Sequence, residues 1–419
     1  MTPHFVIRGG NPLFGKIRAD GMKNAALPIL FALLLVRGEV FLENLPPVTD
    51  IETTLAILSA MGAEIKRESP TCVCIDTSRV APEAVPLDLT TRLRGSCYLL
   101  GASLGRFGRA ESGLPGGCNF GTRPLDQHFA LFESLGASVE QTESKICTTA
   151  PRGLHGAQIE FPFPSVGATG NAILAAVCAR GTTTVLNAAR EPHIADLANF
   201  LNSCGAEISG AGTPVIRIRG VPALHGTRYR IVPDMIEAGT YLCAVCATGG
   251  KICIDNVCPQ HLSAILSSLQ KAGAEITLSE SSVTLERGGR LLGTVLETAP
   301  YPGFPTDMQA QFAPLLCLSE TGGRIYERVW KNRFQYTAEL VRMGATVSLD
   351  RDFAEFAGRD CLIGASVRAT DLRGGAALLI AGLCAAGETR LFDIHHLERG
   401  YPNLMEKCRA LGAEIETCI

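Results

Sequence analysis

The stretch Met61-Gly62-Ala63-Glu64-Ile65 recurs with small changes along the chain. Successive copies of its glycine are 68 to 74 residues apart, which indicates one structural unit repeated six times. An amphipathic segment precedes each glycine and alternating residues follow it. We therefore expect a helix to end at a left-handed glycine and a strand to begin after it. Helices are predicted over 51–61, 193–204 and 403–411, and the six glycines are Gly62, Gly136, Gly205, Gly273, Gly344 and Gly412.

A second glycine marks each copy, at the point where an apolar helix ends before a strand. It lies 21 to 28 residues before the signature glycine, and the distance is longest in the second copy. The two marks together predict an α/β fold built from six strand-helix-strand-helix-strand units. The second set of glycines is Gly38, Gly108, Gly181, Gly250, Gly323 and Gly387.

Six such units are too many for one core, so we expect two lobes of three units each. The N-terminal lobe is predicted to span 23–232, and the C-terminal lobe to combine 1–22 with 233–419. The first strand, Phe5 to Ile7, is expected to pair in the far lobe, because the chain ends on a strand that lacks a partner. The chain would then cross twice between the lobes, with a cleft between them.

The composition predicts a soluble, cytoplasmic protein without a general affinity for nucleic acid or membranes. The chain has 419 residues, a formal net charge of -3 and a pI of about 6.3. Its N-terminus lacks the pattern of a signal peptide, and its longest apolar run, 25–36, is too short to span a bilayer. The sixteen cysteines are therefore expected to be thiols, mostly in the core, as at Cys243 and Cys246.

One cysteine has different surroundings. Cys118 lies in the loop Gly113-Leu114-Pro115-Gly116-Gly117-Cys118-Asn119-Phe120-Gly121-Thr122-Arg123, where glycine leaves the backbone accessible. This loop accounts for the extra length of the second unit. Because loops on a rigid scaffold often carry function, we interpret it as a lid that holds a reactive thiol.

Polar residues cluster where each long apolar helix is expected to begin. Helix N-termini favour anions, and arginine binds carboxylate or phosphate through two hydrogen bonds. One interpretation is an anion-binding centre; the other is that the threonines and aspartates only cap helices and the cations are solvated. Asp307 would be either a general base or the partner of an arginine. The cations concerned are Lys23, Arg94, Arg123, Arg333, Arg373 and Arg399.

Other patterns are weaker. His395-His396 lacks a third metal ligand nearby, so a structural role is favoured and no metal site is expected. Gly210-Ala211-Gly212 lacks the third glycine of a dinucleotide-binding fingerprint. Trp330 would either stack on a ligand ring or pack against the protein.

Several motifs match one known family. They are Gly21-Met22-Lys23-Asn24-Ala25-Ala26-Leu27-Pro28, Leu114-Pro115-Gly116-Gly117-Cys118, Arg123-Pro124-Leu125-Asp126, Asn187-Ala188-Ala189-Arg190-Glu191-Pro192, Phe304-Pro305-Thr306-Asp307-Met308-Gln309-Ala310-Gln311-Phe312, Asn332-Arg333-Phe334, Ala369-Thr370-Asp371-Leu372-Arg373 and Arg399-Gly400-Tyr401. With these motifs the sequence resembles the UDP-N-acetylglucosamine 1-carboxyvinyltransferase family over its whole length. The resemblance implies a two-lobed inside-out α/β barrel with three repeats in each lobe.

The resemblance also implies a reaction. Enolpyruvyl passes from phosphoenolpyruvate to the 3-hydroxyl of UDP-N-acetylglucosamine and phosphate leaves, without a metal or redox cofactor, in the first committed step of peptidoglycan synthesis. It makes Cys118 the general acid and Asp307 a candidate base. It places Lys23, Arg123 and Arg399 around the phosphate. The remaining residues implied at the substrates are Arg94, Arg333 and Arg373 along the anionic cleft, Asn24 at phosphoenolpyruvate, and Arg123, Pro124, Leu125, Asp126, Gln127, Ser165, Val166 and Val329 at the nucleotide sugar.

Two departures from the family pattern remove positive charge. Phe163 stands where many members have lysine, and Met235 where many have arginine. Three rival interpretations remain: the related transferase acting on shikimate 3-phosphate, a non-catalytic paralogue that binds nucleotide sugar, and a thiol redox protein. The Cys118 loop argues against the first, the intact cations against the second, and the lack of a nearby resolving cysteine against the third.

Overall fold

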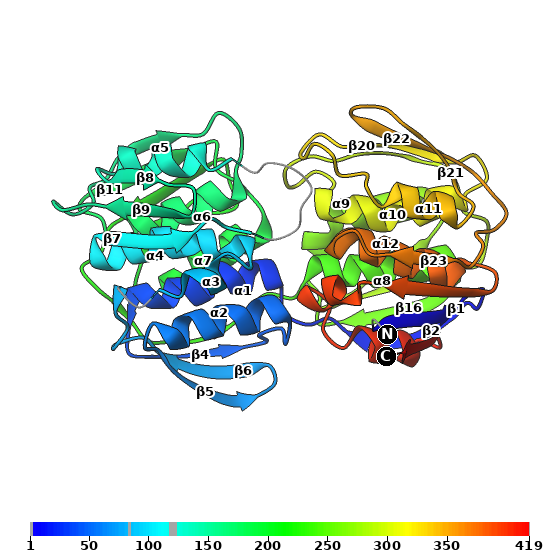
Figure 1. Cartoon of the computed structure of the whole chain (residues 1–419), viewed down its shortest axis with the longest axis horizontal. Coiled ribbons are helices and arrows are strands. Elements are labelled where there is room, and N and C mark those ends of the chain that lie inside the picture. Colours follow the sequence, from blue (N-terminus) through cyan, green and yellow to red (C-terminus); the bar gives the residue numbers. More distant parts are fainter. Residues whose placement is uncertain (1–2, 83–84, 117–123, 419) are drawn as a thin grey trace. The chain divides into compact units, whose positions relative to one another are not determined.

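The computed structural model describes residues 3–82, 85–116 and 124–418. The chain folds into two compact units (Figure 1). One unit holds the described residues of 1–20 and 233–419, and the other holds those of 21–232. The chain passes between the units at Asp20–Gly21 and again at Val232–Pro233.

Apolar helices form the interior of the unit of 21–232, and sheets lie outside them. In α6 (Val166–Ala176) every residue from Ala168 to Ala176 is buried; most are apolar, and the polar Thr169 and Asn171 make hydrogen bonds. Strand β13 (Val215–Arg219) instead alternates, with Ile216 buried and Arg217 exposed, so its sheet covers the helices with one face. The other helices are α1 (Lys23–Ala32), α2 (Thr49–Ala60), α3 (Leu87–Thr90), α4 (Tyr98–Phe107), α5 (Asp126–Ser134) and α7 (Pro192–Ser203).

The strands of this unit form one sheet for each repeat. Two of the sheets have four described strands and the third has three. In spatial order they are β15 (Arg228–Arg230), β4 (Glu39–Glu43), β6 (Cys72–Asp76) and β5 (Glu64–Ser69); β7 (Arg109–Gly113), β9 (Lys145–Thr149) and β8 (Ser138–Gln141); and β10 (Gln158–Glu160), β11 (Thr182–Leu186), β13 and β12 (Glu207–Ser209). A short pair, β14 (Leu224–His225) and β3 (Val36–Arg37), lies apart from them.

The other unit repeats the plan around α8 (Met235–Thr248), α10 (Gln309–Cys317) and α12 (Leu372–Cys384). These three helices pack against one another in every pairing, and nearly all their residues are buried. Its remaining helices are α9 (Ser263–Lys271), α11 (Thr337–Arg342) and α13 (Leu404–Ala410). Its sheets are β17 (Glu275–Leu278), β18 (Ser282–Arg287), β16 (Gly250–Asp255) and β2 (Leu13–Arg18); β19 (Val295–Glu297), β20 (Gly323–Tyr326), β22 (Phe353–Ala357) and β21 (Thr346–Leu349); and β23 (Ser366–Arg368), β24 (Glu388–Phe392), β1 (His4–Arg8) and β25 (Glu414–Cys418).

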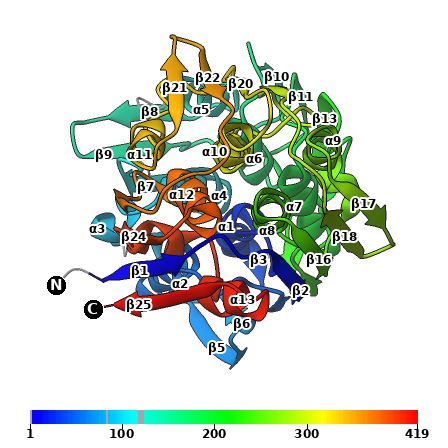
Figure 2. The same ribbon diagram turned by 90° about the vertical axis from the view of Figure 1, so that its right-hand side faces the viewer.

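The sheets show how the chain is exchanged between repeats. Strand β1 lies between β24 and β25 and is antiparallel to both (Figure 2), whereas the sequence predicted only that residues 5–7 pair in this unit. Strand β2 pairs in parallel with β16, whereas β15 pairs in parallel with β4. Each of these two strands thus completes the sheet of a repeat distant in sequence, an exchange that the repeat pattern did not predict.

The glycine marks behave largely as predicted. All six signature glycines have positive φ, between +87° and +105°, so each ends its helix in the left-handed region. In the fifth repeat the left-handed glycine of the second mark is Gly322, with φ of +71°, rather than Gly323. The four-stranded repeats also contain one strand more than the predicted unit, because the strand after each signature turns back into an antiparallel neighbour such as β13.

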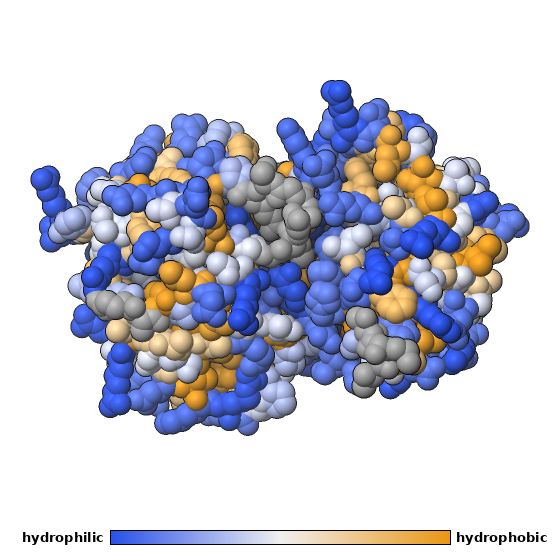
Figure 3. Space-filling model, in the orientation of Figure 1, coloured by the Kyte–Doolittle hydropathy of each residue, from blue (hydrophilic) through white to orange (hydrophobic). Residues whose placement is uncertain are grey.

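Hydrophilic and hydrophobic residues are interspersed on the face drawn in Figure 3. Among the residues that the structure describes, no helix combines the length and the apolar character needed to cross a membrane. Nor do three or more His, Cys, Asp or Glu side chains in this part of the chain gather into a group suited to a metal ion.

A largely buried ionic cluster lies close to both points where the chain passes between the units. Lys407 Nζ lies 2.6 Å from Asp20 Oδ2 and also contacts Glu237 Oε1. Glu237 Oε2 accepts the backbone N–H of Asp20 at 2.7 Å. Burial raises the pKa of Glu237 to about 7, against the opposing charge of Lys407. Removing the lysine would therefore leave two neighbouring carboxyl groups without a cation, which lowers the stability of the folded protein.

Lys407→Met tests this cluster. Because the carboxylates would lose their cation in a site that is largely buried, we expect the free energy of unfolding to fall by about 3–5 kcal/mol. Urea denaturation followed by circular dichroism measures the loss. The control is Lys251→Met, which breaks an exposed 2.8 Å pair with Glu286 and should cost less than about 1 kcal/mol. Equal losses in the two variants would contradict this interpretation.

Candidate active site

Asp307 lies between two buried arginines at the start of α10. The turn η5 (Thr306–Met308) carries Asp307, the second residue of α12 is Arg373, and Arg333 follows β20. Asp307 Oδ1 accepts from Arg333 Nη2 at 2.5 Å, and Asp307 Oδ2 accepts from Arg373 Nη2 at 3.0 Å. Each arginine side chain is 7% exposed and that of Asp307 is 29% exposed, so the carboxylate is the accessible member of the trio. The structure thus brings together three of the residues that the sequence predicted.

The two arginines control the charge of Asp307. Burial by itself would raise the pKa of this carboxyl, but Arg373 and Arg333 outweigh burial and hold the pKa well below its ordinary value. Asp307 is therefore ionised at neutral pH and is a weak proton acceptor while both arginines hold it. Of the two roles considered for Asp307, the structure shows the arginine partner.

A chain of hydrogen bonds fixes the Arg373 guanidinium through Nη1, the terminal nitrogen that does not bind Asp307. Its Nη1 donates to Tyr401 Oη at 3.1 Å, and its guanidinium lies 5.6 Å from the centre of that ring. Tyr401 Oη lies 3.0 Å from Thr240 Oγ1, which donates to the carbonyl of Ile236. Tyr401 therefore donates to Thr240. Gln311 Nε2 donates both to Tyr401 Oη at 3.2 Å and to the carbonyl of Asp307 at 2.7 Å.

Sequence reasoning did not assign roles to Tyr401 or Gln311. Both lie inside family motifs, Arg399-Gly400-Tyr401 and the segment Phe304 to Phe312. The motifs therefore included the two residues but did not indicate what their side chains contact. Their part in the site depends on side chains from α8, α10 and the C-terminal region meeting in space.

Other residues named from the sequence belong to the same unit. Arg399 ends the turn η6 (Ile394–Arg399), which packs against α12, and is half-buried. Val329 donates its backbone N–H to Glu327 Oε1 at 2.8 Å. Met235 begins α8 and is buried. The residue before it, Asp234, caps α8 and accepts the N–H of Ile236 at 2.8 Å.

In the unit of 21–232, Lys23 is the first residue of α1. Its Nζ lies 3.0 Å from Asp50 Oδ2, and both side chains are buried. Asn24 and Arg94 are half-buried, and Arg94 begins the turn η3 (Arg94–Cys97) that leads into α4. Lys23 is therefore a neutralised buried cation rather than a solvated one.

The predicted nucleotide-sugar residues of this unit surround the starts of α5 and α6. Ser165 caps α6 and accepts the N–H of Ala168 at 3.3 Å, and Val166 follows it. The capping interpretation thus holds for Ser165, as it does for Asp234 and Asp371. Phe163 is 57% exposed. Near the start of α5, Pro124 and Asp126 are exposed, Leu125 is half-buried and Gln127 is buried.

Cys118 and Arg123 lie outside the described residues. The other cysteines are free thiols, and Cys243 and Cys246 are fully buried in α8, as predicted.

His128, close to the Cys118 loop in sequence, is a buried neutral imidazole. Asn171 Oδ1 accepts the N–H of Gly101, which orients the amide so that Nδ2 donates to the Cys97 carbonyl and, at 2.9 Å, to His128 Nδ1. His128 Nδ1 is therefore an acceptor without a proton. Burial, with a smaller contribution from Arg94, lowers the pKa of His128 to about 3.

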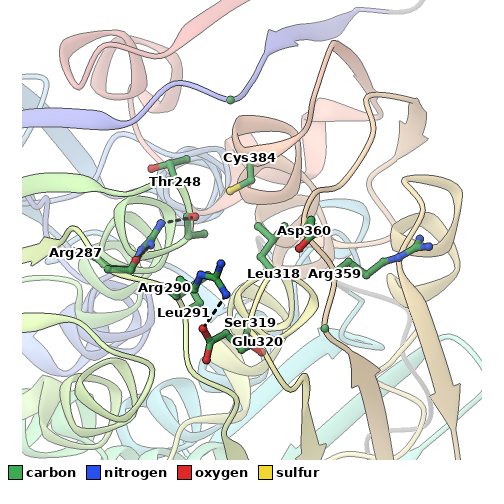
Figure 4. Close-up of a pocket in the computed structure, with 14 residues that line it drawn as sticks. Thr248, Arg287, Arg290, Leu291, Leu318, Ser319, Glu320, Arg359, Asp360 and Cys384 are labelled. Atoms are coloured by element: carbon green, nitrogen blue, oxygen red, sulfur yellow. Dashed lines mark hydrogen bonds and ion pairs between the residues drawn. The ribbon is translucent and has the colours of Figure 1, made fainter.

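A pocket of about 680 Å³ lies at the C-terminal end of α12, whereas Arg373 lies near the N-terminal end of that helix. Figure 4 shows the side chains that line this pocket. It is lined by Thr248 and Cys384, the last residues of α8 and α12. Arg287 Nη2 donates to the carbonyl of Ala247 at 3.1 Å, so this arginine neutralises a helix C-terminus. The pocket is thus separate from the candidate active site.

Comparison with known proteins identifies the family. A family model described as EPSP synthase (3-phosphoshikimate 1-carboxyvinyltransferase) matches residues 7–408. A protein from Clostridium botulinum named UDP-N-acetylglucosamine 1-carboxyvinyltransferase is 45% identical over 410 residues, covering 98% of both chains. One of the same name from Sorangium cellulosum is 46% identical over 410 residues, covering 97% of both. The chain belongs to the UDP-N-acetylglucosamine 1-carboxyvinyltransferase family.

Solved structures agree with this assignment. The enolpyruvyl transferase NikO from Streptomyces tendae superimposes with a TM-score of 0.88 at 27% identity, covering 100% of this chain and 99% of that one. EPSP synthase from Acinetobacter baumannii has a TM-score of 0.74 at 18% identity over both full chains, which shows the shared fold. The predicted inside-out α/β fold and the transferase class are thus confirmed.

The neutral state of His128 predicts a pH dependence of stability. Its pKa is about 3 in the folded protein and about 6.5 in the unfolded chain, so its contribution is complete above pH 6.5 and is lost as the pH falls towards 3. The expected loss is at most about 1.4 kcal/mol per pH unit. Urea denaturation from pH 7.5 to 4.5 measures it. His128→Gln, which can accept from Asn171 but does not titrate, should show a shallower dependence; equal slopes would contradict the assignment.

Proposed function

We propose that the protein transfers the enolpyruvyl group of phosphoenolpyruvate to the 3-hydroxyl of UDP-N-acetylglucosamine and releases phosphate. The observation that carries the proposal is the Asp307 carboxylate between Arg333 and Arg373, in a chain of this transferase family. Both substrates are anions, and guanidinium groups recognise carboxylate and phosphate. The reaction would serve the first committed step of peptidoglycan synthesis in the cytoplasm.

The proposed chemistry is an addition followed by an elimination. The sugar oxygen bonds to C2 of phosphoenolpyruvate while C3 takes a proton, and the tetrahedral intermediate then loses phosphate from C2 and a proton from C3. Cys118 is the proposed acid at C3, and Asp307 the proposed acceptor of the hydroxyl proton. Lys23, Arg123 and Arg399 are proposed to hold the phosphate.

The remaining residues are assigned to substrate binding. Arg94, Arg333 and Arg373 would attract the anionic groups, and Asn24 would hydrogen-bond phosphoenolpyruvate. The nucleotide sugar is assigned to Pro124, Leu125, Asp126, Gln127, Ser165, Val166 and Val329, together with Arg123.

Asp307 can act as an effective base only when its contacts with the two arginines are weakened. While both hold it, its low pKa opposes proton transfer from a sugar hydroxyl. An anionic substrate that draws Arg333 or Arg373 away from Asp307 would raise the pKa of this carboxyl. Binding of phosphoenolpyruvate would thus make Asp307 more basic at the moment when the hydroxyl must be deprotonated.

A phosphate-release assay tests the proposed function. Release should require both phosphoenolpyruvate and UDP-N-acetylglucosamine, and Asp307→Asn should lower kcat by about 10²- to 10⁴-fold because the amide cannot accept the proton. The control is Glu355→Gln, which alters an exposed ion pair with Arg324 in the same unit and should leave kcat unchanged. Two outcomes would overturn the proposed function. One is phosphate release with shikimate 3-phosphate in place of UDP-N-acetylglucosamine, and the other is no phosphate release with either acceptor.

Cys118 is tested by the epoxide phosphonate fosfomycin. We expect intact-mass and peptide measurements to place one adduct on Cys118. Cys118→Asp should retain part of the activity, because a carboxylic acid can also donate a proton, and should escape inactivation. An adduct on another cysteine, or full sensitivity of Cys118→Asp, would refute the role of this thiol.

A further inference from the structure

Glu327 is a buried carboxylate close to the candidate active site. It follows β20 directly and is 6% exposed. Its Oε1 accepts from Thr298 Oγ1 at 2.8 Å and from the backbone N–H groups of Val329 and Trp330 at 2.8 and 3.0 Å. Its Oε2 accepts from Thr306 Oγ1 at 2.8 Å. One oxygen thus fixes the loop after β20, and the other fixes a hydroxyl at the start of α10.

The direction of these hydrogen bonds is determined by chemistry. A carboxylate only accepts, so the single hydroxyl proton of Thr306 points to Glu327. The lone pairs of Thr306 Oγ1 are then free to accept from Arg333, whose Nη1 lies 2.6 Å away. The other terminal nitrogen of the same guanidinium, Nη2, donates to Asp307. Since the guanidinium is planar and rigid, fixing Nη1 also fixes Nη2.

We propose that Glu327 is a positioning residue for the reaction, acting through the Thr306 hydroxyl to aim Arg333 at Asp307. This inference rests on the proposed function of Asp307. Glu327 does not touch Asp307 in the hydrogen bonds described above, so its effect passes through the guanidinium. Without it, the Thr306 proton can turn toward Arg333, where it opposes the N–H donor.

Arg333 and Arg373 are held by two different sets of hydrogen bonds, which we call arms. Arg373 is fixed by Tyr401, which donates to Thr240 on α8, whereas Arg333 is fixed by Thr306 and Glu327. The two arms meet at the Asp307 carboxylate. This arrangement provides an internal control, because changes within one arm should be coupled more strongly than changes in different arms, which share only Asp307 and Gln311.

The first experiment is a double-mutant cycle on kcat for phosphate release. Thr306→Val keeps the shape of the side chain but removes the hydroxyl, and Glu327→Gln keeps its size but removes the charge. Each should lower kcat about ten- to a hundredfold by misplacing Arg333, and the double variant should be no slower than the slower single one. Thr306→Ser, which restores the hydroxyl, should recover most of kcat.

The matched comparison is Thr306→Val combined with Tyr401→Phe. Because these changes loosen different arginines, their fold-losses in kcat should come closer to multiplying than those of Thr306→Val and Glu327→Gln. The proposal is wrong if the fold-losses in kcat of Thr306→Val and Glu327→Gln multiply as fully as those of this comparison. It is also wrong if Thr306→Ser is as slow as Thr306→Val, because Glu327 then does not act through the hydroxyl. Circular dichroism of each variant shows whether it is folded before its kcat is compared.

The second experiment does not need activity. A ¹³C NMR titration of the Asp307 carboxyl, recognised by its absence in Asp307→Asn, should show a higher pKa in Thr306→Val and in Glu327→Gln than in the wild type. The reason is a looser contact with Arg333, while Arg373 remains in place. An unchanged pKa in both variants would overturn the positioning role. A wild type without phosphate release but with these shifts would overturn only the proposed function.

Discussion

The structure depends on burying helices that are mostly apolar and expose almost no residue. α6, α8 and α12 have no polar face to turn toward water, so sheets must lie outside them. Strands with one exposed and one buried face, such as β13, meet that need. In the unit of 1–20 and 233–419, this arrangement packs α8, α10 and α12 together, and polar residues at the start of α10 and α12 meet there. The site is thus a consequence of how the core is closed.

The second constraint is electrostatic. Arg333 and Arg373 are both buried, and a buried cation needs an anion or dipole to offset its lost hydration. Asp307 supplies that anion, and its own pKa falls as a result. An anionic substrate competes for the same guanidinium groups, which links substrate binding to the basicity of the carboxylate.

The sequence predicted the features that short-range patterns encode. The glycine signature located every left-handed helix end it marks, and the motifs placed Asp307, Arg333 and Arg373 in one site. It could not predict the exchange of β2 and β15, because strand partners distant in sequence leave no local pattern. Nor could it predict that Lys407 meets Asp20, since this pair depends on the closed fold. The roles of Tyr401 and Glu327 escaped for the same reason.

One difference among the repeats explains why Asp307 is available. Asp234 and Asp371 occupy comparable places before α8 and α12. One carboxylate oxygen of each accepts hydrogen bonds from two backbone N–H groups of its helix. Before α10 the turn η5 intervenes, and within the described part of the chain Asp307 makes no such cap. Its two oxygens are therefore left for the two arginines. A single extra turn at one helix start thus converts a structural cap into a carboxylate that faces cations, while the fold of the repeat is retained.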